Sequence, residues 1–372
     1  MGLDENGASA AEGRRGRALR LFVGMSLLVA AGAAGCSGGG GGGGTGAGGA
    51  GGTGGDGGMG GAGGMGGVGG MGGVGGMGGE GGGDPGPSVD TTNPQLYKVS
   101  FKADEADPAA TQALGTQVAF LDTRTTPRGQ LVVYLHGAGA PSTCGSNAHG
   151  EALAGLGFHV LGPCYVSDYG VGNCGDDIGG CRLEAFEGVD HHPFIDITPP
   201  NSAEHRITKG LAYLAQQNPE GDWTYFLDGD KPRWDKIIIS GISHGASTAA
   251  VIGKHRLVPR VVSLSGPLDG GQAWLKEPSL TPIDRFLAFS HTADSQHPGH
   301  LESFEDLGLP GAPTSIDGMM PPYGGSHRLI SSADTSDGHV GTQAGSPSPK
   351  NPDGSYAYLP VWTYLYAGAG AP

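Results

Sequence analysis

The chain has 372 residues and a formal net charge of −15, and 77 of its residues are glycine. More than half of these glycines lie before residue 90, where the side chains are too few and too small to build a core. The acidic balance argues against nucleic acid or an anionic membrane surface as a partner, since both require a basic face.

The N-terminal residues have the pattern of an export signal. Several arginines precede an apolar stretch from Leu21 to Ala34, which is too short to span a bilayer comfortably. The stretch ends in Ala-Ala-Gly-Cys, which resembles the lipobox of bacterial lipoproteins, although Ala33 stands where leucine is usual. We expect residues 1–35 to be a signal peptide and Cys36 to be lipidated, with ordinary signal peptidase cleavage as the alternative. The protein is thus expected in the cell envelope, touching the membrane only through its anchor, or otherwise secreted.

Residues 36–94 are predicted to be a flexible tether. They are dominated by glycine, with a Gly-Gly-X repeat from Thr53 to Glu80. Collagen needs proline-rich X and Y positions, which this repeat lacks. A coil of this length reaches roughly 40 Å root-mean-square, at about 5–6 Å per square root of residue number. Several prolines then mark the start of a folded domain, which we expect to cover residues 95–372.

Four cysteines follow Cys36, and all lie in one short window of the domain: Cys144, Cys164, Cys174 and Cys181. Four cysteines permit three pairings. Cys144 follows one predicted strand and Cys164 ends the next, which favours a 144–164 disulfide together with 174–181. A zinc site is the alternative. The spacing lacks the Cys-x2-Cys knuckle typical of zinc ligands, so disulfides are favoured in an oxidising compartment.

The first half of the domain alternates short apolar runs with one small-residue helix. Residues 97–101 and 116–122 alternate like antiparallel edge strands. Residues 130–137 form a continuous apolar run, as expected of a strand buried on both faces. The following pattern predicts a helix at 147–156, a strand at 158–163 and an amphipathic helix at 202–217 capped by Ser202.

The second half of the domain continues the alternation of predicted strands and helices. Three β-rich runs each end at a polar or glycine-bearing turn, a weaker strand follows, and an apolar helix closes the chain: 236–241, 260–266, 285–291, 325–332 and 359–368. Strands that alternate with helices indicate an α/β fold with a mostly parallel, doubly wound sheet flanked by helices. Such sheets carry their chemistry at the carboxyl ends of the strands.

The sharpest chemical signal is Gly241-Ile242-Ser243-His244-Gly245, which matches G-x-S-x-G between a strand and a helix of small residues. This turn forces its serine into strained backbone angles and crowds the strand against the helix. Gly241 and Gly245 relieve the crowding because they carry no Cβ. We therefore expect Ser243 to be a nucleophile, against the alternative of a serine in an ordinary strand–helix turn.

A nucleophilic serine needs donors for the oxyanion that forms on its substrate. The third strand ends in Leu-His-Gly-Ala-Gly, residues 135–139. This loop is expected to offer a backbone N–H from Ala138 or Gly139, with a second from His244 just after the serine. Two such donors lower the barrier by several kcal/mol, at about 2.7–4 kcal/mol each.

From about residue 95 onward, these motifs resemble those of the α/β-hydrolases, in a bacterial lipase- or esterase-like branch. The resemblance implies the chain order nucleophile, acid, histidine. It makes Asp294, after the strand at 285–291, the expected acid, with Asp269 one strand earlier as the alternative. His339, in a late loop, is the expected base in preference to His327, which directly precedes the last strand.

The implied activity is hydrolysis of carboxylic esters through an acyl-enzyme, on a small-molecule, lipid or polymer ester. A serine peptidase or amidase on the same fold is one alternative, and a tethered binding protein with an inactive site is another. No cofactor or metal is expected, because neither the histidines between 291 and 300 nor Asp-Gly-Asp at 228–230 show a full ligand set. Two segments interrupt the alternation of strands and helices and are expected to form part of the wall of the substrate pocket: residues 165–201 and 296–325. The sequence carries no signal for the oligomeric state.

Overall fold

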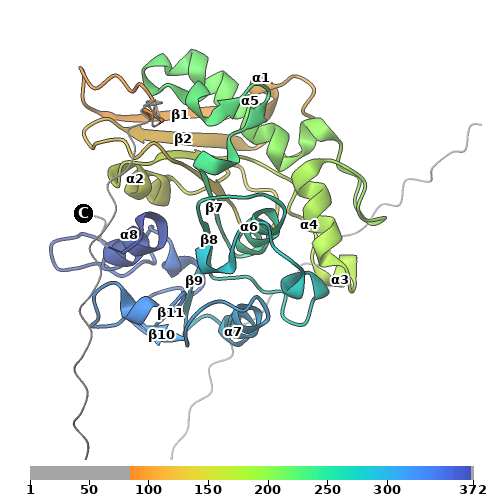
Figure 1. Cartoon of the computed structure of the whole chain (residues 1–372), viewed down its shortest axis with the longest axis vertical. Coiled ribbons are helices and arrows are strands. Elements are labelled where there is room, and N and C mark those ends of the chain that lie inside the picture. Colours follow the sequence, from red (N-terminus) through yellow and green to blue (C-terminus); the bar gives the residue numbers. More distant parts are fainter. Residues whose placement is uncertain (1–83, 370–372) are drawn as a thin grey trace, which may run out of the picture. The chain divides into compact units, whose positions relative to one another are not determined.

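The computed structural model of the protein describes residues 84–369. Its centre is a sheet with the strand order β1-β2-β4-β3-β7-β8-β9-β11-β10 (Figure 1). The first two strand pairs are antiparallel and every later pair is parallel. The strands are β1 (Leu96–Lys102), β2 (Thr116–Asp122), β3 (Leu131–Leu135), β4 (His159–Gly162), β7 (Ile237–Ile242), β8 (Val261–Leu264), β9 (Phe286–His291), β10 (Thr314–Ser315) and β11 (Arg328–Ser331).

Helices connect these strands. They are α1 (Ala103–Ala106), α2 (Asn147–Gly155), α3 (Val171–Cys174), α4 (Ile178–Glu187), α5 (Ala203–Gln217), α6 (His244–His255), α7 (His297–Asp306) and α8 (Leu359–Ala367). A separate two-stranded ribbon pairs β5 (Leu227–Asp228) with β6 (Lys231–Pro232). The order of strands, the crossover helices and the sharp turn between β7 and α6 are those of an α/β-hydrolase fold.

The central strands are buried on both faces, and their sequence explains why. In β3, Leu131, Val133 and Leu135 pack into one apolar cluster, whereas Val132 and Tyr134 pack into a second cluster on the opposite face. Side chains alternate across a strand, so a continuous apolar run is needed to fill two cores.

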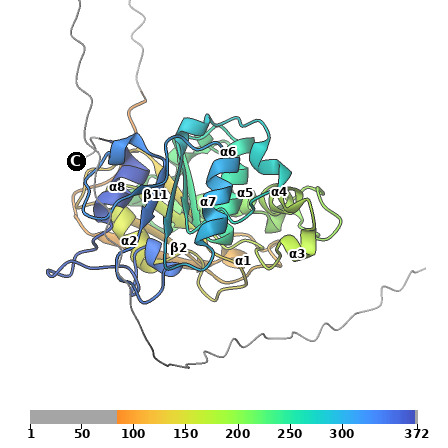
Figure 2. The ribbon, with the colours of Figure 1, turned by 90° about the horizontal axis from the view of Figure 1, so that it is seen from below.

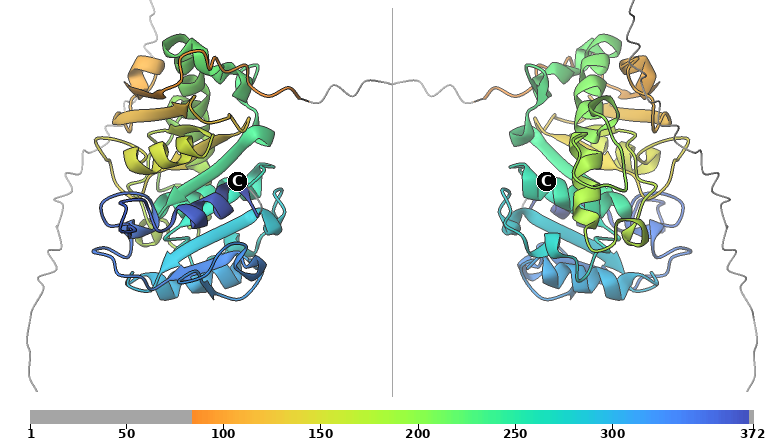
Figure 3. Two further views of the ribbon diagram at one scale, coloured as in Figure 1. Left: turned by 90° about the vertical axis from the view of Figure 1, so that its left-hand side faces the viewer. Right: turned by 90° about the vertical axis from the view of Figure 1, so that its right-hand side faces the viewer.

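The two faces are covered by different helices (Figures 2 and 3). Helices α2 and α8 cover one face, where Leu153 and Trp362 lie in the same core. Helices α4, α5, α6 and α7 cover the other, with Ile207 of α5 and Phe304 of α7 in its core. This double layering confirms the doubly wound sheet expected from the alternation of strands and helices.

The expected strands and helices of the domain are present, and the structure adds elements that were not predicted: α1, α3, α4, α7, β5, β6 and β10. Helix α7 lies in residues 296–325, which the sequence presented as a Pro- and Gly-rich rim. Pro298 falls in the first turn of α7, where its missing N–H costs no intrahelical hydrogen bond. The proline therefore starts this helix and does not break it. The other expected rim, 165–201, holds α3 and α4.

Two disulfides join the four cysteines of the domain. Cys144 pairs with Cys164, and Cys174 pairs with Cys181. This is the pairing favoured by the sequence, and it leaves these cysteines no thiolates for a zinc site. The first disulfide ties the loop after β3 to the end of β4, and the second ties α3 to α4.

Contacts to the domain begin earlier than the expected boundary at residue 95. Asp84 forms ion pairs with Arg233 and Lys236, each at 2.8 Å. Further along, the Asp90 N–H donates to the Glu220 carbonyl at 2.9 Å. The last residues assigned to the tether are therefore bound to the folded domain.

The expected signal peptide, the lipidation of Cys36 and the tether up to residue 83 lie outside the described residues. Between residues 84 and 369, no helix is long and apolar enough to cross a membrane.

Candidate active site

Ser243 occupies a strained turn between β7 and α6. Its φ of 57° and ψ of −123° lie in a region of backbone conformation that residues other than glycine rarely adopt. A Cβ at Gly245 would collide with the carbonyl oxygens of Leu135 and His136, and one at Gly241 would collide with the backbone of Gly245. The two glycines thus permit the close approach of strand and helix that the motif requires.

Asp294 and His339 are brought together from distant parts of the chain. His339 Nδ1 lies 2.7 Å from Asp294 Oδ2. The Asp294 carboxylate is held in place because its Oδ1 accepts the Gln296 N–H at 2.9 Å. The Asp294 side chain is 2% exposed and that of His339 is 28% exposed. A buried carboxylate therefore holds an imidazole whose other edge is open to solvent.

Ser243 and His339 are both anchored to the end of β8. The Ser243 N–H donates to the Leu264 carbonyl at 3.0 Å. Ser265, the next residue, donates its hydroxyl to the His339 carbonyl at 2.6 Å. Over the described residues, Ser243 Oγ has no hydrogen-bond partner, and catalytic contacts commonly tighten only when substrate binds.

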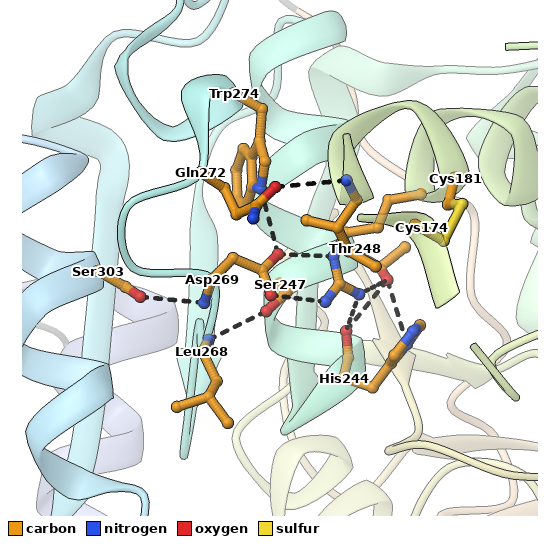
Figure 4. A network of polar contacts seen from close by, with 12 residues as sticks. Cys174, Cys181, His244, Ser247, Thr248, Leu268, Asp269, Gln272, Trp274 and Ser303 are labelled. Atoms are coloured by element: carbon orange, nitrogen blue, oxygen red, sulfur yellow. Dashed lines mark hydrogen bonds and ion pairs between the residues drawn. A yellow bond between two sulfur atoms is a disulfide. The ribbon is translucent and has the colours of Figure 1, made fainter. Parts of the chain in front are cut away.

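Asp269, the alternative acid, is already engaged elsewhere (Figure 4). Arg182 of α4 donates to both of its carboxylate oxygens, from Nε at 2.8 Å and from Nη2 at 2.9 Å. The indole of Trp274 donates to the same carboxylate at 3.2 Å. Both members of the ion pair are almost completely buried. This geometry leaves Asp294 as the carboxylate that faces His339.

The same arginine also supports the nucleophile turn. Arg182 Nη1 donates to the His244 carbonyl and to Thr248 Oγ1, each at 3.2 Å. The buried ion pair therefore connects α4 and the loop after β8 to the first turn of α6. The sequence alone carries no signal for this role, because Arg182 lies in the middle of α4 with Glu184 and Glu187 on the same helix.

The oxyanion donors differ in one respect from the expectation. The Gly139 N–H donates to the Ser167 carbonyl at 3.0 Å, so it is not free to serve a substrate. Over residues 84–369, the N–H groups of Ala138 and His244 have no protein acceptor. Of the three expected donors, the N–H of Gly139 is thus engaged within the protein, whereas those of Ala138 and His244 are available.

The oxyanion loop is clamped by the segment that follows β4. Ser167 Oγ lies within hydrogen-bonding distance of the carbonyls of Gly137 and Gly139, at 3.1 and 2.8 Å. Tyr165 donates its hydroxyl to the His136 carbonyl at 2.9 Å. These contacts fix the loop before any substrate arrives, which is what electrostatic stabilisation of an oxyanion requires.

Histidines near the nucleophile are held neutral by burial. Burial lowers the pKa of His136 to about 4. The pKa of His244 is lowered well below its usual value by burial, and the charge of Arg182 contributes in the same direction. Neither imidazole competes with His339 as the exposed base of the site. His327, rejected as a base, binds the Phe286 carbonyl at 2.9 Å.

Two further histidines lie behind Asp294. Ser290 Oγ lies 2.8 Å from His297 Nδ1 and 2.9 Å from His300 Nδ1. The hydroxyl has one proton, so it donates to one ring and accepts from the other. Burial lowers the pKa of His300 to about 4, which keeps this ring neutral beside the acid, with its Nδ1 3.9 Å from Asp294 Oδ2.

No family model matches the chain, and none of the curated proteins compared with it matches. Several solved structures are similar in fold. The fluorophosphonate-binding serine hydrolase F of Staphylococcus aureus is 13% identical, with 64% of this chain and 92% of that chain covered and a TM-score of 0.33. A carbohydrate esterase from gut microbiota is 15% identical, covering 66% and 90%, with a TM-score of 0.35. S-formylglutathione hydrolase of Staphylococcus aureus is 12% identical, covering 64% and 92%, with a TM-score of 0.34. These similarities concern the fold alone.

Proposed function

We propose that the protein is a serine hydrolase that cleaves carboxylic esters through an acyl-enzyme. Ser243 Oγ attacks the ester carbonyl while His339 takes the hydroxyl proton and then delivers it to the departing alcohol. Asp294 holds the imidazole in the required tautomer and stabilises its charged form. The N–H groups of Ala138 and His244 bind the oxyanion. Water, activated by the same histidine, then releases the acid.

One observation carries the proposal. His339 Nδ1 lies 2.7 Å from a buried carboxylate, on a loop bonded to the end of β8, to which the Ser243 N–H also donates. A hydrogen bond at Nδ1 leaves Nε2 unprotonated in the neutral ring, which is the state that a general base needs.

The test compares ester and amide substrates on the mature protein. We expect turnover of p-nitrophenyl acetate that Ser243→Ala abolishes, and much slower release of p-nitroaniline from a matched anilide. Faster cleavage of the anilide or of peptides would favour an amidase. A folded protein with no turnover of either substrate would favour a binding protein and contradict the proposal.

We further propose that the enzyme works outside the cytoplasm, held by lipid on Cys36. The proposal rests on the sequence pattern of residues 1–36 and agrees with two disulfides in the domain. Mass spectrometry of the mature N-terminus tests it: a diacylated Cys36 is expected. A chain that keeps Met1, or that starts at an unmodified residue, would contradict lipidation.

A further inference from the structure

A cavity of about 240 Å³ lies beside the oxyanion loop. Its walls come from three segments: residues 112–115 before β2, the loop from His136 to Cys144 after β3, and residues 165–168 after β4. The lining is mainly apolar, and the side chains or backbone that shape it include Ala113, Leu114, Pro141, Tyr165 and Val166.

The loop that walls this cavity also approaches the nucleophile, although Ser243 itself is not among the lining residues. His136 and Gly139 both line it, and Gly137 stands between them in the chain. A Cβ at Gly137 would lie 3.5 Å from Ser243 Cβ and 3.8 Å from Ser243 Oγ. A substrate whose carbonyl meets Ser243 and the Ala138 N–H therefore has one end beside this cavity.

The order of strands indicates whether the acyl chain or the alcohol of the ester lies beside the cavity. The cavity lies over the ends of β4 and β3, on one side of β7, which carries Ser243. Asp294 and His339 lie over β8 and β9, on the other side of β7. The base must reach the leaving oxygen to protonate it, so the alcohol points toward β8 and β9. The acyl chain then points in the opposite direction, toward β3 and β4.

Building on the proposed function, we infer that this cavity is the acyl-binding site and that the enzyme prefers short, uncharged acyl groups. A mainly apolar cavity of about 240 Å³ suits a short aliphatic acyl chain better than a long fatty acyl chain. The carboxylate of Asp168 on the wall disfavours acyl groups that carry a negative charge of their own.

A disulfide and several hydrogen bonds brace the walls of the cavity. The Cys144–Cys164 disulfide joins the loops after β3 and β4. Asn201 Oδ1 accepts the N–H groups of both Thr111 and Gln112 at 2.9 Å. Arg206 Nη2 donates to the Gln112 carbonyl at 2.7 Å. A rigid cavity discriminates by length, because an extra methylene that cannot be accommodated changes kcat/KM by about 10- to 200-fold.

The experiment measures kcat/KM on p-nitrophenyl acetate, hexanoate and palmitate, which share one leaving group. Hexanoate is expected to exceed both others by at least about tenfold. Val166→Trp fills the cavity, so it is expected to lower hexanoate turnover by at least about tenfold while acetate changes by less than about threefold. Leu114→Ala widens the rim and is expected to shift the preference toward longer chains. Leu268→Trp, an exposed position after β8, is the matched control and keeps the hexanoate-to-acetate ratio.

Equal losses on acetate and hexanoate in Val166→Trp would overturn the assignment, as would palmitate being the best substrate. An unchanged ratio in both cavity variants, with unaltered melting temperatures, would also overturn it. These outcomes differ from failure of the proposed function itself, in which the unsubstituted protein hydrolyses no p-nitrophenyl ester.

Discussion

At the scale of single residues, the site depends on which carboxylate is free to face an imidazole. The sequence placed Asp269 and Asp294 after neighbouring strands and left the choice open. What decides between them is Arg182, which lies far away in the chain and takes both oxygens of Asp269. Such a long-range ion pair has no local pattern, so only the fold could reveal it. The hydrogen bond that engages the Gly139 N–H has no local pattern either, since its partner Ser167 belongs to another loop.

The two carboxylates are predicted to respond differently to substitution. Asp294→Asn removes the acceptor for His339 Nδ1 and favours the wrong tautomer, so kcat should fall by about 10⁴-fold with little change in stability. Asp269→Ala leaves the buried guanidinium of Arg182 unpaired and should lower the free energy of unfolding by about 3–5 kcal/mol. Steady-state kinetics and urea unfolding of both variants check this contrast. A catalytic loss confined to Asp269→Ala would reverse the assignment.

A buried histidine is predicted to make the protein sensitive to acid. His149 Nδ1 accepts the Ala344 N–H at 3.2 Å, and its Nε2 lies 3.1 Å from the Tyr366 hydroxyl. Burial lowers the pKa of His149 from 6.5 to about 3. Below pH 6.5 this histidine therefore binds a proton in the unfolded chain, whereas in the folded chain it stays neutral until the pH approaches 3. Stability is complete above that pH and declines as the pH falls toward 3.

The size of this effect follows from the difference in pKa. At about pH 5 the loss is about 2 kcal/mol, at about 1.36 kcal/mol for each pH unit below the unfolded pKa. Urea unfolding at about pH 7.5 and 5 should show a smaller difference between the two pH values in His149→Gln than in the unsubstituted protein. The same difference in both proteins would mean that another group controls the acid response.

At the scale of elements, the sequence predicted strands and helices well where burial dictates the residues. Runs such as Leu131–Leu135 and Ile237–Ile242 fill two cores at once, which leaves little freedom in composition. Helix α7 was not predicted, because its first residues include Pro298 and Gly299 and its sequence is polar. Its burial comes from tertiary contacts of Phe304 and Leu307, which a local pattern does not show.

The disulfides belong to this scale, and their contributions to stability should differ. Cys144–Cys164 spans a sequence separation of 20 and Cys174–Cys181 one of 7. Loop-closure entropy gives about 3 kcal/mol for the first and about 2 kcal/mol for the second. Guanidinium unfolding of the double variants C144S/C164S and C174S/C181S measures how much free energy of unfolding each disulfide contributes. An equal or larger loss from the second pair would show that the entropy of the unfolded chain does not control the effect.

At the scale of the whole molecule, residues 84–94 are predicted to be part of the folded domain. Asp84 bonds to Arg233 and Lys236, and the Ser88 N–H donates to Asp222 at 2.8 Å. A chain that begins at residue 80 should therefore melt at a higher temperature than one that begins at residue 95. Calorimetry of the two chains measures both melting temperatures. Equal values would contradict the prediction and favour the domain boundary at residue 95 that composition suggested.

The central claim is that Ser243 is a nucleophile activated by His339 and Asp294. The most direct measurement is peptide mass spectrometry after reaction with a fluorophosphonate, which labels activated serines covalently. The account predicts one adduct on Ser243, formed much more slowly in His339→Ala and absent in Ser243→Ala. A folded protein that hydrolyses esters but carries no adduct on Ser243, or carries one at another serine, would contradict it.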